Sequence, residues 1–183
     1  MTTELTISAQ AADVTRTASL RLRVDPTGLR PSASYTIGFS GLRDNRAPVP
    51  TYTESGFTIS SVSAEWMAIT TIGNPLPSLQ FMTAAGVTTT GEIRITSSGP
   101  PFWLNSVDLY SSTTGIPYVI EGFLSGEPAY TAFAVHQFPF GRFVRTENPD
   151  DNVPVDAVVI RLSNPAAPCC ANPMGVDNIV LNR

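Results

Sequence analysis

Short alternations of apolar and polar residues follow one another along most of the chain. Side chains two residues apart share a face of a β-strand, so such alternation predicts strands with one buried face. Turn-forming runs rich in Gly, Pro, Asn and Asp separate these segments, for example at 73–75 and 148–151. The predicted strands are Leu5–Ser8, Leu20–Val24, Tyr35–Phe39, Phe57–Val62, Trp66–Thr71, Glu92–Thr96, Trp103–Tyr110, Tyr118–Leu124, Ala132–Val135, Val155–Leu162 and Val176–Leu181. This spacing predicts an all-β fold, an antiparallel jelly-roll β-sandwich over residues 33–183.

The last predicted strand contains an acid at an unusual position. Asp177, Ile179 and Leu181 have the same parity, which predicts that Asp177 lies on the apolar side of the strand. Burying a carboxylate that has no partner destabilises the folded state by roughly several kcal/mol. We therefore expect either a bound cation or a set of backbone N–H donors beside Asp177.

Residues 1–32 form a predicted N-terminal β-arm or hairpin. Its apolar residues at strand spacing are Leu5, Ile7, Leu20, Leu22 and Val24. Two isolated strands are marginally stable in water, so this arm needs a surface on which to dock. We expect that surface to belong to a neighbouring copy, which predicts a homo-oligomer or another surface assembly.

Composition excludes several classes of partner. The 183 residues include 11 Arg and no Lys, and the formal net charge is −4. No basic patch is visible, so nucleic acid is not an expected partner. No apolar stretch is long enough to span a membrane, and the N-terminus lacks the features of a secretory signal. The expected location is a virion surface or the extracellular space.

Three runs of sequence resemble a known type of domain. They are Ile37–Leu42 continuing into Val49–Ile59, Phe102–Leu109, and Val176–Ile179. Together they are similar to the secreted bacterial jelly-roll domains of PEP-CTERM proteins, which are of the galactose-binding-like or carbohydrate-binding-module-like type. The sorting tail of such proteins is absent, and Ser40 stands where these domains often have an acid. The resemblance implies a glycan-binding sandwich.

The resemblance also implies a structural calcium ion. Its side-chain ligands would be Asp177 and Glu54, assisted by the backbone carbonyls that calcium accepts readily. The alternative is that Asp177 caps the turn at 172–175 through backbone N–H groups, while Glu54 is a solvated acid in a loop.

Aromatic residues are the candidates for a ligand-binding surface. Trp66, Tyr110 and Tyr130 are the residues predicted to stack on a sugar, because an aromatic face suits the C–H face of a pyranose. Core packing is the competing interpretation, and it accounts for most aromatic residues of this chain.

The sequence contains no arrangement typical of an enzyme. His136 is the only histidine, and there is no nucleophile-elbow or phosphate-loop motif. No catalytic residue is predicted. Cys169 and Cys170 are adjacent, and their Cα atoms are closer than ordinary disulfide spacing. This favours two free thiols, and a strained bridge between the two is the alternative.

Two functions fit these observations. The first is a non-catalytic structural or adhesive β-sandwich of a surface assembly, such as a virion decoration or fibre protein. The alternative is a secreted glycan-binding module. The first accounts for the arm and is slightly favoured. Exposed aromatic side chains beside polar groups would favour the second.

Overall fold

The computed structural model describes residues 2–11, 14–23, 33–137, 141–164 and 170–183, with side chains from residue 33 onward. The chain divides into two compact units, Met1–Arg30 and Pro31–Arg183. In the first unit, β1 (Thr2–Ala11) pairs with β2 (Val14–Arg23) in an antiparallel hairpin in which Leu5 is opposite Leu20. Val24 lies outside the described residues. Docking of this hairpin on a neighbouring copy stays a prediction.

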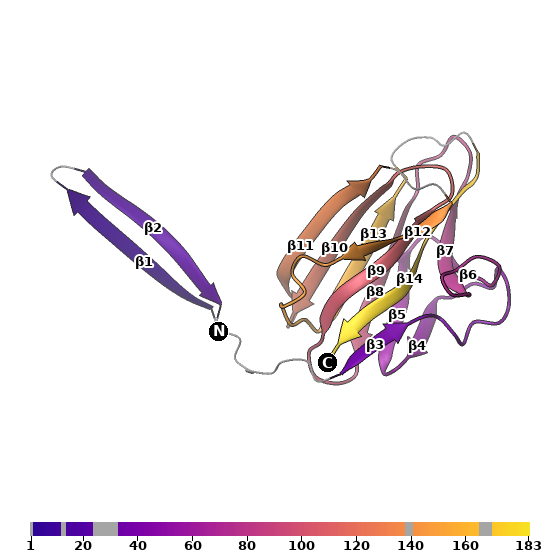
Figure 1. Cartoon of the computed structure of the whole chain (residues 1–183), viewed down its shortest axis with the longest axis horizontal. Coiled ribbons are helices and arrows are strands. Elements are labelled where there is room, and N and C mark those ends of the chain that lie inside the picture. Colours follow the sequence, from indigo (N-terminus) through magenta and orange to yellow (C-terminus); the bar gives the residue numbers. More distant parts are fainter. Residues whose placement is uncertain (1, 12–13, 24–32, 138–140, 165–169) are drawn as a thin grey trace. The chain divides into compact units, whose positions relative to one another are not determined.

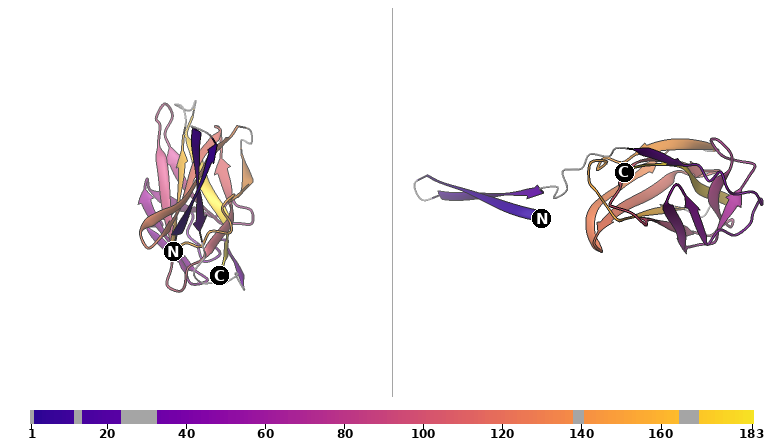
Figure 2. Two further views of the ribbon diagram at one scale, coloured as in Figure 1. Left: turned by 90° about the vertical axis from the view of Figure 1, so that its left-hand side faces the viewer. Right: turned by 90° about the horizontal axis from the view of Figure 1, so that it is seen from below.

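The second unit is an antiparallel sandwich of two sheets (Figures 1 and 2). The first sheet has the order β11-β10-β13-β8-β5-β4, and its strands are β4 (Thr51–Glu54), β5 (Phe57–Ser63), β8 (Thr90–Ser97), β10 (Ile116–Leu124), β11 (Glu127–His136) and β13 (Ala157–Ser163). The second has the order β12-β9-β14-β7-β6, with β3 paired to β14; its strands are β3 (Ser34–Ile37), β6 (Trp66–Ile69), β7 (Ser78–Thr83), β9 (Trp103–Ser111), β12 (Arg142–Glu147) and β14 (Asn172–Asn182). The predicted all-β, jelly-roll sandwich is confirmed.

The core lies between the two sheets and is filled by alternate residues of their strands. Ile93 and Ile95 of β8 and Val107 and Leu109 of β9 belong to one contiguous cluster of buried side chains. The residues between these positions lie on the outer faces of the sheets. The functional candidates are therefore found on the outer faces and at the ends of the sandwich.

The alternation in the sequence does not predict three strands of the sandwich, β4, β7 and β12. Strand β7 lacks a visible alternation because five of its six residues are buried, on both faces. Strand β12 contains Arg142, Arg145 and Glu147, which give it the polar character of a loop. Strands β7 and β12 escape prediction for the same reason, since alternation is visible only where one face meets the core and the other meets water.

A β-bulge changes the predicted orientation of Asp177. Met174 and Val176 belong to the core cluster, so Asp177 lies on the opposite side of β14 from them. The register with β9 then shifts between Asp177 and Val180, and Asn178 adopts a φ of 42°. The extra residue returns Ile179 and Leu181 to the core. The prediction that Asp177 shares a face with Ile179 and Leu181 is therefore wrong.

Candidate functional site

A row of four residues crosses the outer face of the first sheet. Phe133 of β11 is opposite Val119 of β10, Val119 is opposite Arg161 of β13, and Arg161 is opposite Glu92 of β8. Their chain neighbours Ala132, Ile120, Ile160 and Ile93 are core residues, so the row faces outward. We call these four residues the cross-strand row. Three strand spacings give it a length of about 14 Å.

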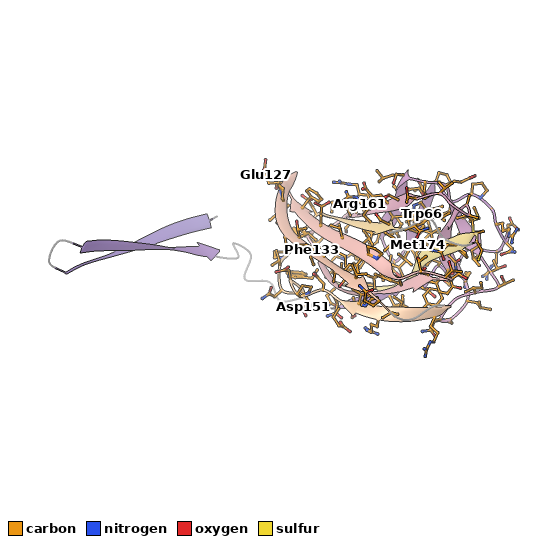
Figure 3. All side chains as sticks on the ribbon, turned by 90° about the horizontal axis from the view of Figure 1, so that it is seen from above. Trp66, Glu127, Phe133, Asp151, Arg161 and Met174 are labelled. Atoms are coloured by element: carbon orange, nitrogen blue, oxygen red, sulfur yellow. The ribbon has the colours of Figure 1, made fainter. Side chains whose placement is uncertain are left out.

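Phe133 is the exposed aromatic side chain at one end of the row. It is 77% exposed, the highest value among the large hydrophobic residues described as exposed. Figure 3 labels it together with Arg161. Thr131 and Val135 flank it on the same face of β11, and Val135 is 45% exposed. A benzyl ring held open on a rigid strand offers a flat apolar surface to a ligand.

Arg161 organises the polar half of the row. Its guanidinium lies 2.7 Å from Glu92 Oε2 and 3.4 Å from Glu121 Oε2. One cation on β13 therefore holds a carboxylate from each of the two strands that flank β13. Hydrogen bonding to Glu92 is the main cause that raises the pKa of Arg161. The three side chains are between 18% and 35% exposed, so they remain accessible while their orientations are set. Such a network presents fixed donors and acceptors to a polar ligand.

An aromatic–cation pair lies beside this network. The Arg94 guanidinium carbon is 5.6 Å from the centroid of the Phe123 ring, a cation–π distance. Arg94 is opposite Val159, which in turn is opposite Glu121. The outer face of the first sheet therefore combines aromatic rings, guanidinium groups and carboxylates.

The aromatic residues named from the sequence lie elsewhere. Trp66 is 1% exposed, Tyr110 is 5% exposed and Tyr130 is 8% exposed. Trp66 packs on Phe81 with ring centroids 4.8 Å apart, and its Nε1 donates to the carbonyl of Ser63. Such burial leaves none of the three with an open ring face for stacking on a sugar.

Tyr130 illustrates how a glycine accommodates a buried ring. It is opposite Gly122, and a Cβ at Gly122 would collide with the Tyr130 ring. Burial raises the pKa of the Tyr130 hydroxyl. Tyr110 is likewise covered, because the Phe143 ring centroid is 4.9 Å away on the neighbouring strand. The core-packing interpretation holds for Trp66 and Tyr130, which belong to the core cluster, whereas Tyr110 is buried outside that cluster against Phe143.

Asp177 is fully buried and is held by backbone donors. Its Oδ2 accepts from the N–H of Asn74 at 2.7 Å, and its Oδ1 accepts from the N–H of Asn178 at 2.8 Å. The side-chain amide of Asn178 donates through Nδ2 to Asp108 Oδ2 and to the carbonyl of Asn74. The expectation of backbone donors beside Asp177 is met, but they come from the 70–77 loop and the bulge rather than from the 172–175 turn.

Burial raises the pKa of Asp177 to about 6. The two backbone N–H donors oppose this effect, whereas the negative charges of Asp108 and Glu54 add to it. Asp108 is directly opposite Asp177 on β9. The carboxylates of Asp108 and Glu54 thus both act on Asp177 at this end of the sandwich.

Glu54 is partly buried rather than a solvated loop acid. Its Oε2 accepts from the Phe39 N–H at 3.0 Å and the Tyr52 hydroxyl at 3.2 Å, and its Oε1 accepts from the Ser40 hydroxyl at 2.8 Å. All four carboxylate oxygens of Asp177 and Glu54 thus already accept hydrogen bonds. Among residues 33–137, 141–164 and 170–183, no group of three or more His, Cys, Asp or Glu side chains is placed to hold a metal.

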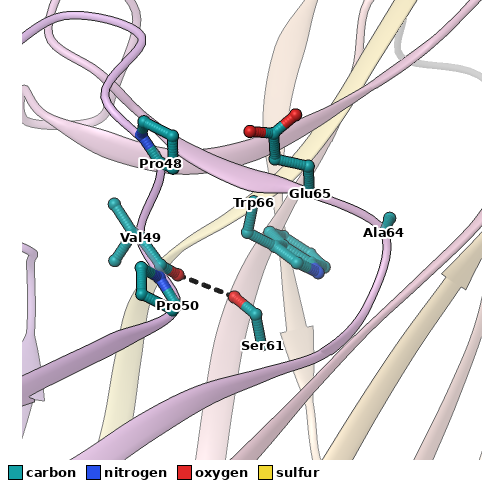
Figure 4. A pocket seen from close by; sticks show the side chains of 7 residues that line it. All are labelled: Pro48, Val49, Pro50, Ser61, Ala64, Glu65 and Trp66. Carbon is teal, nitrogen blue, oxygen red and sulfur yellow. Dashed lines mark hydrogen bonds between the residues drawn. The ribbon is translucent and has the colours of Figure 1, made fainter.

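A pocket of about 350 Å³ opens where the segments 48–50 and 61–66 meet (Figure 4). The apolar walls of the pocket are formed by two proline rings, Val49 and Trp66. Glu65 is the acidic residue in its lining. The Ser61 hydroxyl donates to the carbonyl of Val49 at 2.7 Å and closes one side. Ser61 is the hydroxyl group of the lining, and it bonds to a backbone carbonyl rather than to a base.

The remaining candidates for chemistry are engaged in structural contacts. His136 Nε2 lies 2.8 Å from the Thr146 hydroxyl, its ring stacks on Tyr118, and burial lowers its pKa. Cys170 is disulfide-bonded, so the expectation of free thiols is wrong; Cys169, the only other cysteine, lies outside the described residues. No helix in the described part of the chain could cross a membrane.

Comparison with known proteins gives only remote structural likenesses. No family model matches the chain, and no curated protein matches it. Among solved structures, the family 29 carbohydrate-binding module from Piromyces equi has a TM-score of 0.48 at 10% identity, covering 82% of this chain and 89% of that one. TmCBM61 in complex with β-1,4-galactotriose has a TM-score of 0.44 at 9% identity, with coverages of 77% and 99%.

A third similar structure is the family 11 module of the cellulosomal cellulase Lic26A-Cel5E from Clostridium thermocellum. Its TM-score is 0.33 at 16% identity, covering 81% of this chain and 94% of that one. All three TM-scores are below 0.5. These likenesses therefore carry no conclusion about function.

Proposed function

We propose that this protein is a non-catalytic glycan-binding module whose ligand lies along the cross-strand row. The observation that carries the proposal is the exposure of Phe133 on the same rigid face as the Arg161–Glu92–Glu121 network. A sugar ring has one apolar C–H face and a rim of hydroxyl groups. An aromatic ring next to fixed donors and acceptors matches both features.

The length and charge of the row indicate the kind of glycan. About 14 Å separates Phe133 from Glu92, which suits an oligosaccharide chain rather than a single sugar. One guanidinium is balanced by two carboxylates, so the polar half of the row has no excess of positive charge to attract an acidic ligand. A neutral polysaccharide is therefore the proposed ligand class.

Exchange of Phe133 for Ala tests the proposal. Stacking on an aromatic ring contributes about 0.5–1.5 kcal/mol beyond the area buried, so we expect affinity to fall roughly tenfold. Binding is measured by affinity electrophoresis in gels that contain soluble neutral polysaccharides, followed by calorimetry with oligosaccharides.

The control is Met82→Ala, which removes another exposed apolar side chain, on the second sheet. It should bind like the wild type. Wild-type protein that is not retarded by any polysaccharide of the panel, or equal affinity of Phe133→Ala and wild type, would contradict the proposal.

A further inference from the structure

Strand β11 forms one edge of the first sheet (Figure 1). It pairs with β10 on one side, and within the described residues no strand pairs with its other side. Alternate backbone N–H and C=O groups of an edge strand point away from the sheet. They can form hydrogen bonds with another strand, so proteins usually protect such edges.

The other edges of the sandwich are protected by shortness or by charge. Strands β4, β6 and β3 have four residues each. Strand β12 has six residues and includes Arg142, Arg145 and Glu147. Short edges and charged side chains both disfavour pairing with another chain.

Strand β11 has Glu127, Pro128 and a bulge at its start, but from Tyr130 to Val135 it has neither form of protection. It has ten residues, and the segment from Pro128 to Val135 contains no charged side chain. Phe133 is 77% exposed, Val135 is 45% exposed, and Ala134 between them is also exposed. A long, uncharged and apolar edge is the type of surface that pairs with another strand.

We infer that two copies of this chain associate through their β11 strands, in antiparallel pairing about a two-fold axis. A strand is complementary to itself in this arrangement, because the donors and acceptors of one copy meet the acceptors and donors of the other. The uncharged segment places no like charges opposite each other at the centre of the contact. A second copy can therefore pair with the segment Tyr130–Val135, and no other protein is required.

The arrangement has a consequence for the outer face. A two-fold axis between antiparallel edge strands keeps the outer faces of both sheets on the same side. The two first sheets then form one continuous sheet, and both copies of Phe133 lie on one surface. This inference does not rest on glycan binding, but a dimer of this kind would present two cross-strand rows to one polysaccharide chain.

Sedimentation velocity of the full chain over a concentration series tests the inference. The wild type should move toward twice the monomer mass as its concentration rises. Ala134→Lys places a lysine of each copy in the contact, and like charges there should weaken association roughly tenfold or more. The control Thr53→Lys adds the same charge to an exposed position of the opposite edge strand, β4, and should associate like the wild type.

Hydrogen exchange gives an independent measurement. The amides of residues 130–135 should be better protected in the concentrated wild type than in Ala134→Lys. A wild type that stays monomeric at every concentration, or an Ala134→Lys variant that keeps the dimer mass, would overturn the inference. Ala134 faces away from Phe133, so Ala134→Lys should keep its affinity for a short oligosaccharide, whereas Phe133→Ala loses it.

Discussion

At the residue scale, Asp177 is the side chain with the most unusual environment. It is buried next to Asp108, and backbone donors rather than a basic side chain hold it. The sequence predicted its burial correctly from the apolar residues around it. The sequence did not predict its orientation, because a bulge at Asn178 interrupts the alternation.

Acid should stabilise the protein through Asp177. The pKa of this carboxyl is about 6 in the folded protein, compared with 3.8 for an unperturbed aspartate, the value expected in the unfolded chain. The folded state therefore binds a proton more tightly, and stability gained from this group rises as the pH falls from above 6 toward 4. The difference corresponds to at most about 3 kcal/mol.

Urea unfolding at pH 7.5 and pH 5 measures this effect. Other groups titrate in the same interval, including His136, whose lowered pKa acts in the opposite direction. The quantity to compare is therefore the change in unfolding free energy of the wild type minus that of Asp177→Asn. A positive difference at the lower pH is expected, and equal changes in both proteins would contradict the assigned pKa.

At the element scale, the sequence predicted strands best where a strand has one face in the core and one in water. Strand β8 shows this pattern, with Gly91, Ile93 and Ile95 buried between more exposed residues. Phe133 was missed as a site residue although Thr131, Phe133 and Val135 share a parity opposite to the buried Tyr130 and Ala132. That alternation was the available signal. The Arg161 network could not be predicted, because it depends on which strands are neighbours.

A calcium ion joining β14 and β4 stays a prediction at this scale. Asp177 and Glu54 belong to different sheets, and the negative charges of Asp108 and Glu54 raise the pKa of Asp177. A divalent cation bound there would compensate this charge and stabilise the contact between the sheets. Calcium should then raise the melting temperature of the wild type at pH 7.5 but not that of Asp177→Asn. Identical melting curves of the wild type with calcium and with a chelator would exclude the site.

At the scale of the whole molecule, the hairpin and the sandwich are separate compact units. The sandwich, Pro31–Arg183, contains the whole described core and the cross-strand row. The sequence predicts an arm separate from a sandwich, because the arm has apolar residues but too few to form a core. Which surface each unit would use for the proposed association depends on edges and register, which the strand pattern alone does not determine.

Deletion of residues 1–30 separates the two possible routes to association. The remaining chain keeps both sheets, so we expect a folded β-protein whose melting temperature stays within a few degrees of the full-length value. If β11 carries the contact, the deleted form should keep the same dependence of mass on concentration as the full chain. Loss of the dimer on deletion would instead assign association to the hairpin, as the apolar residues Leu5, Ile7, Leu20 and Leu22 first suggested, and would contradict the β11 interface. A deleted form that unfolds would contradict the independence of the two units, which circular dichroism determines directly.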